Sequence, residues 1–297
     1  MANFPGTDRN ILTQKAYATE DQLIVRQRTH DLYSVPKVNF AEWVLDRIAW
    51  RGDEIVLDVG AGPGSYFDLI ADRIPRGKLV GGDLSLGMAH KAAEHPKAGP
   101  VLNFDAQELP FADNSFDVVL ANHMLYHVPD VELALGEIHR VIRPGGRMIA
   151  ATNSQYNQPE FEQLIRRAYN FLGVAAEADH MRAAEQHFNL EDGTMKLAHH
   201  FFAVARYDLP GAFVFPSLQP VLDYLNSTRA LREPQLPRRV SWEDFMNVMA
   251  DQIQRLINHF GELVVNKLAG VLVATDRGVF ARDYVSLLTH EDTTRTP

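Results

Sequence analysis

Short apolar segments alternate with helical patterns between residues 54 and 153, and this alternation constrains the fold more than any other feature of the chain. Amphipathic stretches separate the apolar segments; one of them, residues 131–142, ends before Arg143-Pro144-Gly145-Gly146. Strands that alternate with helices form a parallel sheet with helices on both faces. We therefore predict an α/β domain whose strands lie at residues 55–59, 78–82, 101–104, 116–121 and 147–152.

The alternation becomes irregular beyond residue 153. Phe201–Tyr207 and Leu268–Thr275 are predicted to be further strands. A long helix is expected over residues 241–260, with Ser241 as its N-cap and Gly261 at its end. Residues 1–40 show no strand pattern, although Asp21–Leu32 is expected to form a helix in front of the sheet.

Composition excludes several classes of function. The 297 residues include no cysteine, so disulfides, thiolate zinc sites, iron–sulfur clusters and a cysteine nucleophile are excluded. The net charge of −9, from 29 basic and 38 acidic residues, argues against nucleic acid as the main partner. The apolar segments are shorter than the roughly 18–20 residues of a membrane span, and residues 1–10 lack a signal-peptide pattern. We expect a cytoplasmic protein, monomeric or homodimeric, with a small-molecule partner.

A glycine-rich loop, Gly60-Ala61-Gly62-Pro63-Gly64, follows the first predicted strand. Glycines at a strand-to-helix junction allow a sharp turn and a close approach of the backbone to a ligand. The third glycine of the pyrophosphate-binding pattern G-x-G-x-x-G is missing, because Ser65 stands there. Asp58, two residues before the turn, suits an amine-bearing ligand better than a diphosphate. A turn with a purely structural role is the alternative.

Two more acids follow the next two strands. Asp83 stands 23 positions after Gly60, where a carboxylate can accept hydrogen bonds from ribose hydroxyls; an acid that merely flanks a helix is the alternative. Asp105 can accept a hydrogen bond from an exocyclic adenine amine. Because the carboxyl ends of parallel strands meet at the ligand-binding edge of a sheet, we expect Asp58, Asp83 and Asp105 to lie together.

These motifs, taken as an ordered set, resemble the class I S-adenosylmethionine-dependent methyltransferases. The resemblance spans about residues 40–153 and is carried by Val56–Gly64, Gly82-Asp83, Asp105–Phe111, Phe116–Leu120 and Arg143–Gly146. It implies a Rossmann-like, doubly wound, seven-stranded and mostly parallel sheet with an antiparallel last strand. From the pattern along the chain we further expect an N-terminal helical lid (residues 1–40) and a methyltransferase domain (residues 41–297) that carries an α-helical, substrate-side insertion at about residues 154–200.

The resemblance assigns the glycine-loop side of the site to the methionine part of the cofactor. Asp58 would lie near the amino group of S-adenosylmethionine, directly or through water. Tyr17 would close over the cofactor from the lid, with a simple core aromatic as the alternative. The loop residues that would face the cofactor are Gly60, Ala61, Gly62 and Gly64.

The remaining cofactor positions carried over by resemblance belong to the adenosine part and the methyl group. Asp83 would hold the ribose. The adenine would contact Leu84, Met88, Asp105, Ala106 and Gln107. Asn122 and His123, just after the fourth strand, would pass beside the sulfonium carbon. S-adenosylhomocysteine would be the product.

Methyl transfer from a sulfonium is an in-line displacement in which the protein mainly aligns the acceptor and excludes water. A hydroxyl acceptor must lose a proton, and a histidine of near-neutral pKa is the natural base. His127 is the first candidate and His123 the second. The alternative is that these histidines line the cofactor or cap the helix that begins near Asp130.

The expected function is methyl transfer to oxygen or nitrogen of a small molecule. A nicotinamide-dependent oxidoreductase on a similar sheet and a non-catalytic cofactor-binding module are the alternatives. No metal is expected, because no pair among the candidate ligands has a clear i, i+4 spacing with a supporting acid. Those candidates are His180, Glu185, His187, Asp192, His199 and His200.

Overall fold

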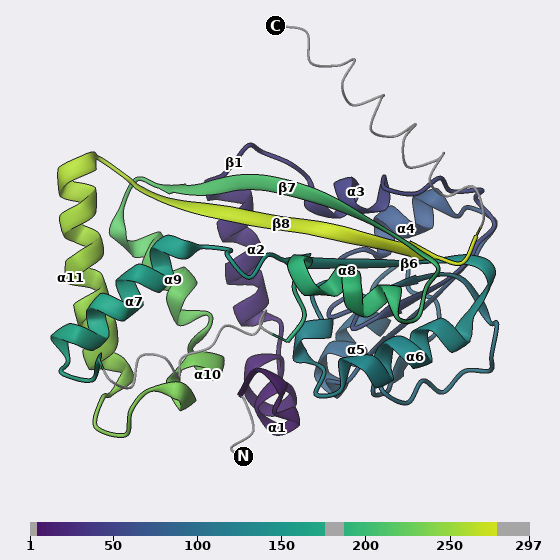
Figure 1. The fold of residues 1–297 in the computed structure, drawn as a ribbon, viewed down its shortest axis with the longest axis horizontal. Coiled ribbons are helices and arrows are strands. Elements are labelled where there is room, and N and C mark those ends of the chain that lie inside the picture. Colours follow the sequence, from purple (N-terminus) through teal and green to yellow (C-terminus); the bar gives the residue numbers. More distant parts are fainter. Residues whose placement is uncertain (1–4, 176–186, 278–297) are drawn as a thin grey trace, which may run out of the picture.

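A computed structural model describes residues 5–175 and 187–277 of the chain (Figure 1). One eight-stranded sheet runs through the molecule in the order β1-β7-β8-β6-β5-β2-β3-β4. Its parallel strands are β2 (Ile55–Val59), β3 (Lys78–Asp83), β4 (Val101–Asn103), β5 (Phe116–Leu120) and β6 (Ile142–Asn153). β8 (Leu263–Thr275) pairs antiparallel with both β6 and β7 (Ala203–Phe215). The predicted Rossmann-like sheet with an antiparallel last strand is confirmed.

The sheet has one strand more than the seven expected. β1 (Ser34–Val35) pairs antiparallel with β7, opposite Phe213 and Ala212. The expectation that residues 1–40 hold no strand is therefore wrong, because a two-residue strand is too short to show alternation. β7 and β8 are 13 residues each, longer than their predicted segments. Polar residues and Pro210-Gly211 interrupt the apolar pattern of the extended part of β7, so its length was not visible in the sequence.

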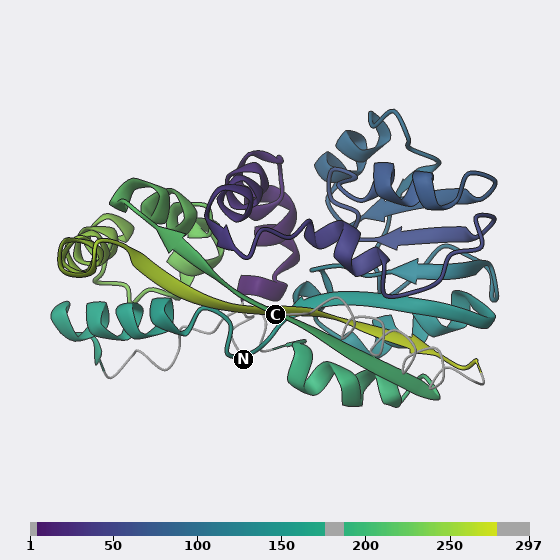
Figure 2. The same cartoon turned by 90° about the horizontal axis from the view of Figure 1, so that it is seen from above.

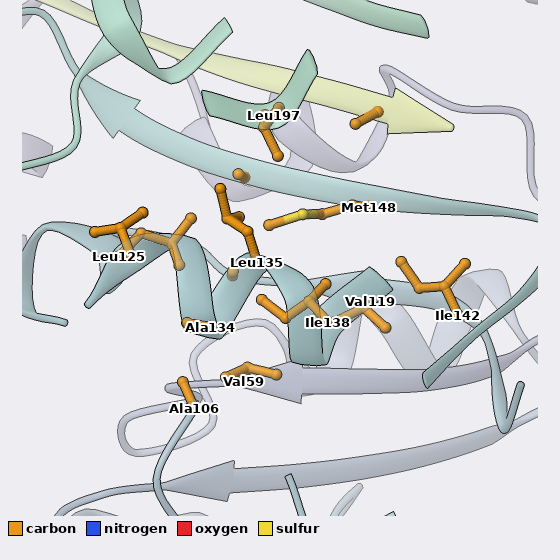
Figure 3. Close-up of a cluster of buried hydrophobic side chains, with 14 of the residues drawn as sticks. Val59, Ala106, Val119, Leu125, Ala134, Leu135, Ile138, Ile142, Met148 and Leu197 are labelled. Atoms are coloured by element: carbon orange, nitrogen blue, oxygen red, sulfur yellow. The ribbon is translucent and has the colours of Figure 1, made fainter. Parts of the chain in front are cut away.

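Helices cover both faces of the sheet, and the residues of each strand alternate between the two faces. Val119 and Met148 pack beneath α6 (Val131–Val141), where Leu135 and Ile138 are buried (Figure 3). α8 (Leu190–Ala198) covers the same face. The next residues along the strands contribute to the opposite core, which is closed by α3 (Phe40–Leu45), α4 (Phe67–Arg73) and α5 (Leu86–Ala93). We call β2–β6 with α3–α6 the glycine-loop half.

A second hydrophobic core forms where β7 and β8 extend beyond the other strands (Figures 1 and 2). Phe213, Phe215 and Val265 of the two strands pack against the fully buried Phe245 and Tyr169. Its helices are α7 (Pro159–Phe171), α9 (Leu218–Asn226) and α11 (Trp242–Phe260). The predicted caps of α11 are confirmed: the Ser241 side chain accepts from the Asp244 N–H, and Gly261 ends the helix with φ +85°. We call this assembly the second core.

The predicted lid lies between the glycine-loop half and the second core (Figure 2). It contains short turns of helix followed by α2 (Asp21–Tyr33), which contacts α9 and β7. The short elements are η1 (Pro5–Thr7), α1 (Arg9–Ile11) and η2 (Leu12–Ala16) in the lid, and α10 (Arg229–Arg232) and η6 (Glu233–Gln235) opposite it. Part of the predicted insertion, residues 176–186, lies outside the described residues. Its described helices belong to different places, because α7 is in the second core and α8 covers the sheet.

Candidate functional site

A cavity of about 1330 Å³ opens at the carboxyl ends of β2, β3 and β5 and is closed on its other sides by the lid, β7, β8 and α10. Every residue predicted to contact the cofactor lines it except Gly64, and so does His127. Parallel strands bring their carboxyl ends to one edge, so residues from positions 58 to 127 meet here although they are distant in sequence. The sequence therefore identified one wall of this cavity.

The glycine loop needs glycine for two distinct reasons. Gly60 and Gly62 have φ of +70° and +56°, which side chains on L-residues rarely adopt. A Cβ on Gly60 would also lie 2.7 Å from the Cβ of Met124, so this position excludes larger residues on packing alone. Gly64 does not line the cavity. A Cβ on this residue would lie only 2.8 Å from the ring of Phe67, so glycine makes room for that ring. Gly64 thus packs the loop onto α4.

Asp58 is a buried acid with one unsatisfied oxygen. It is 2 % exposed, and its Oδ2 has no hydrogen-bond partner among the described residues. Burial, and secondarily the charge of Asp83, raises the pKa of Asp58 to about 8. A carboxyl group left in this state gains a partner when a cationic group enters the cavity beside it.

Asp83 and Asp105 are fixed by backbone donors. The N–H groups of Gly62 and Ser85 donate to Asp83 at 2.9 and 2.8 Å. Burial raises the pKa of Asp83, and these two hydrogen bonds oppose the shift. Asp105 accepts from the backbone N–H and the side-chain amide of Gln107, at 2.9 and 3.0 Å. Both carboxylates are held rigidly at the cavity wall, each with lone pairs left for a ligand.

Asn122 and His123 lie where β5 ends. Asn122 accepts from the Ala151 N–H at 3.0 Å, while its buried Nδ2 has no partner among the described residues. His123 has φ +54°, and its backbone N–H donates to the Ala151 carbonyl at 2.8 Å. Burial lowers the pKa of His123 to about 4, so the ring is neutral at pH 7. No residue of the described chain forms a hydrogen bond with this ring. Its centre lies 5.3 Å from the centre of the Phe40 ring.

His127 is tied to the lid through both ring nitrogens. Nδ1 lies 2.7 Å from the Gly6 carbonyl, and Nε2 lies 2.9 Å from the Tyr17 hydroxyl. A carbonyl only accepts, so Nδ1 carries the proton and Nε2 accepts from Tyr17. Burial is the main cause that lowers the pKa of His127 to about 4. Tyr17 is further fixed because Ser85 donates to its carbonyl at 2.7 Å.

Basic side chains on the wall opposite the glycine loop were missed by the sequence analysis. Arg26 and His30 of α2 and Lys267 of β8 line the cavity, as does Arg232 of α10. Lys267 contacts Nδ1 of His30 at 3.0 Å and donates to the Ser34 hydroxyl at 2.6 Å. No local motif surrounds any of them; only the position of Lys267 beside a predicted strand pointed toward the sheet.

No group of three or more His, Cys, Asp or Glu side chains that could hold a metal occurs within residues 5–175 and 187–277. Of the candidate ligands, His180 and Glu185 lie outside those residues. His200 instead faces Glu132 at 2.9 Å, and Asp192 pairs with Lys196 at 2.6 Å. The helices within the same described ranges include none with the length and apolar character needed to cross a membrane.

The glycine-loop half is similar in sequence to known methyltransferases. Residues 57–150 match the family model of a methyltransferase domain. Demethylmenaquinone methyltransferases from Listeria welshimeri and Staphylococcus aureus are each 35 % identical to the chain, over 123 and 120 residues, or 39 % of this chain. These matches cover 52 % and 50 % of the two relatives, so the chain spans about half the length of the curated relatives it matches.

Solved structures share the fold more widely. A putative methyltransferase from Bacillus halodurans aligns with a TM-score of 0.54 at 19 % identity, covering 80 % of this chain and 98 % of that one. Phosphoethanolamine N-methyltransferase 2 from Haemonchus contortus aligns with a TM-score of 0.54 at 16 % identity, covering 93 % and 61 % of the two chains. The glycine loop, the acids at the strand ends, the strand order and these matches agree. Residues 57–150 therefore carry a methyltransferase domain, and the chain has the fold of the class I S-adenosylmethionine-dependent methyltransferases.

Proposed function

We propose that this protein transfers the methyl group of S-adenosylmethionine to an oxygen or nitrogen atom of a small-molecule acceptor by in-line displacement. One observation carries the proposal: a single cavity contains both the three strand-end carboxylates, Asp58, Asp83 and Asp105, and a second, open wall with room for another molecule. Its volume of about 1330 Å³ exceeds the roughly 300–1,000 Å³ of a pocket for one drug-sized ligand. A cofactor and an acceptor can therefore meet inside it.

The carboxylates provide complementary contacts for S-adenosylmethionine. The unsatisfied oxygen of Asp58 suits the ammonium of the methionine part. Asp83, oriented by the Gly62 and Ser85 N–H groups, retains acceptor capacity for the ribose hydroxyls. Asp105, held by Gln107, is positioned for the adenine amine. The sulfonium carries the methyl group, and the protein's part is to hold it against the acceptor without water.

His123 is the histidine that suits proton removal in this arrangement. Its neutral ring lines the cavity without a hydrogen-bond partner in the described chain, whereas both nitrogens of His127 are engaged by Gly6 and Tyr17. We therefore assign the base for a hydroxyl acceptor to His123 and give His127 the role of fastening the lid. A neutral amine acceptor attacks through its own lone pair and needs no base beforehand.

The activities named for the relatives support a small-molecule acceptor. The curated relatives are demethylmenaquinone methyltransferases. The Haemonchus contortus structure is a complex with phosphomonomethylethanolamine and S-adenosylhomocysteine. We propose for this chain a small-molecule acceptor, a cytoplasmic location, a monomeric or homodimeric state and no nucleic-acid partner.

Calorimetric titration with S-adenosylhomocysteine, NADH and NADPH tests the cofactor. Micromolar binding of S-adenosylhomocysteine alone is expected. Binding of a nicotinamide cofactor instead would favour the oxidoreductase, and binding of S-adenosylhomocysteine without turnover of any acceptor would favour a non-catalytic module.

Once an acceptor is known, turnover of His123→Ala and His127→Ala separates the two histidines. For a hydroxyl acceptor, His123→Ala should lower kcat by about 10²–10⁴-fold with unchanged binding of S-adenosylhomocysteine. His127→Ala should act more weakly and raise the KM for the cofactor, because it releases the lid. The opposite ranking would return the base to His127.

A further inference from the structure

Apart from Arg9 of the lid, which lies 3.7 Å from Asp105, charges are segregated across the cavity. The wall formed by β2, β3 and the loop after β4 carries carboxylates, whereas the wall formed by α2, β8 and α10 carries Arg26, Lys267 and Arg232. Among the described residues, the carboxylate that lines this second wall is Asp31, which is exposed and whose backbone carbonyl accepts from Lys37. The acids are accounted for by the proposed cofactor, but nothing in that function accounts for the cations.

Lys267 and Arg26 lack counter-ions in the described chain. The ammonium of Lys267 lies 4.2 Å from the centre of the Phe213 ring and meets only neutral groups, the Ser34 hydroxyl and the His30 ring. Arg26 donates through Nη1 to the Ser227 carbonyl at 2.9 Å, and its buried Nη2 has no hydrogen-bond partner among the described residues. Placing cations away from water without a partner costs free energy, so these two side chains favour an anion brought by a ligand.

His30 adds a third donor to the same place. The Lys267 ammonium can only donate, so Nδ1 of His30 accepts from it and Nε2 carries the proton. Burial, and after it the charges of Lys267, His123 and Arg26, lowers the pKa of His30 to about 3. Arg26 stands four residues before His30 on α2, so the two side chains share one face of the helix, and both line the cavity. His30 therefore stays neutral and donates through Nε2.

The cationic cluster is close to the reaction end of the cavity. Arg26 lies 5.5 Å from the centre of the Tyr17 ring, and the Tyr17 hydroxyl contacts His127 at 2.9 Å. Arg26, Lys267 and His30 also line the same continuous cavity as the glycine loop. A small molecule whose reacting atom lies beside His123 can thus reach the cluster with another of its groups.

We propose that the methyl acceptor carries an anionic group, a carboxylate or a phosphate, which Arg26 and Lys267 bind with His30 as a further donor. This inference rests on the proposed function and names the acceptor class. Charge-assisted hydrogen bonds are the strong ones in proteins, and three donors from two elements fix the orientation of the anion. The cluster thereby determines which end of the acceptor faces the sulfonium.

The test compares three probes of similar shape: benzoate, phenyl phosphate and the neutral benzamide. Each is titrated into the protein, free and saturated with S-adenosylhomocysteine, at constant ionic strength, and binding is measured by calorimetry. At least one anion is expected to bind tenfold or more tightly than benzamide. The ratio between benzoate and phenyl phosphate identifies carboxylate or phosphate as the preferred group.

Variants assign the effect to the cluster. Lys267→Met and Arg26→Met should each weaken binding of the preferred anion by tenfold or more and leave benzamide unaffected. Lys78→Met, which removes a charge from an exposed position at the opposite end of β3, is the matched control and should bind as wild type does. Binding of S-adenosylhomocysteine by each variant shows that it is folded.

Absence of binding by both anions, equal binding of benzamide, or unchanged binding by Lys267→Met would overturn the inference. Failure of the proposed function is a separate outcome: S-adenosylhomocysteine would not bind, while the free protein would still discriminate the anions from benzamide.

Discussion

The glycine-loop half and the second core solve different problems with the same sheet. In the glycine-loop half, β2, β3 and β5 are five or six residues long, and their carboxyl ends and the loops that follow them line the cavity. In the second core, two strands of 13 residues continue past the sheet and carry three helices on their own hydrophobic cluster. The family match ends at residue 150, before this second core. The cofactor side is therefore built from local motifs, whereas the opposite side is built by long-range packing.

The largest expected effect tests whether the second core is a separate folding unit. Phe245→Ala removes a ring that is 1 % exposed and should lower the free energy of unfolding by about 3–5 kcal/mol. Urea unfolding followed by fluorescence, with Trp242 as the probe in this core, measures it. Phe260→Ala, at the 67 % exposed end of the same helix, is the control and should change little. Unchanged binding of S-adenosylhomocysteine by Phe245→Ala would show that the glycine-loop half stands alone.

The next largest effect is expected from a substitution in the glycine loop. Gly60→Ala forces a side chain into a backbone of φ +70° and against Met124, so it should cost about 1–3 kcal/mol of stability and more than tenfold in S-adenosylhomocysteine affinity. Thermal unfolding and calorimetry measure the two losses. Gly261→Ala has a similar φ of +85° but no atom within 4 Å of its Cβ, so it should lose stability without losing affinity. Equal losses of affinity in both variants would contradict a specific role for the loop.

Asp83→Ala should weaken S-adenosylhomocysteine binding by about 1–3 kcal/mol, because charged hydrogen bonds to the ribose are lost. Calorimetry at pH 7.5 measures the change. Asp68→Ala removes an exposed carboxylate from α4 and should leave the affinity as it is. A matching loss in Asp68→Ala would mean that only the overall charge of this half matters.

The raised pKa of Asp58 predicts a pH-dependent affinity. Below its pKa of about 8 the free protein keeps Asp58 protonated, and the cofactor's ammonium requires the carboxylate, so binding releases a proton. Affinity for S-adenosylhomocysteine should therefore rise by up to about 1.4 kcal/mol per pH unit between roughly pH 6 and 8 and then level off. Calorimetry in two buffers of different ionisation enthalpy counts the proton. Asp58→Asn should show neither the slope nor the proton release.

The smallest effect concerns the lid between the two regions. Tyr17→Phe removes the hydroxyl that donates to His127 and should make the free energy of lid closure about 0.5–1.5 kcal/mol less favourable. Hydrogen exchange over residues 5–33 should become faster in the absence of cofactor. Tyr33→Phe, at the end of α2 and away from His127, serves as control. Unchanged exchange in Tyr17→Phe would show that other contacts hold the lid.

The difference between the two regions also explains what sequence analysis predicted. Asp58, Asp83 and Asp105 each follow a recognisable apolar strand, and parallel pairing alone places such residues at one edge. The family and the fold were predicted correctly for that reason. β1 was missed because two residues show no periodicity, and the extended halves of β7 and β8 because polar residues and Pro210-Gly211 interrupt them. The roles of the individual site residues remain predictions.

By itself the sequence determined the order of strands and helices from residue 55 to 153, the glycine loop and the wall of acids. These features depend on residues close together in the chain, which is why local patterns reveal them. Only the tertiary structure decided that His127 binds Tyr17 and Gly6 across more than 100 residues, and that Lys267 meets His30. Such contacts depend on where the lid and the long strands pack, and burial, not residue type, determines which of these groups remains charged.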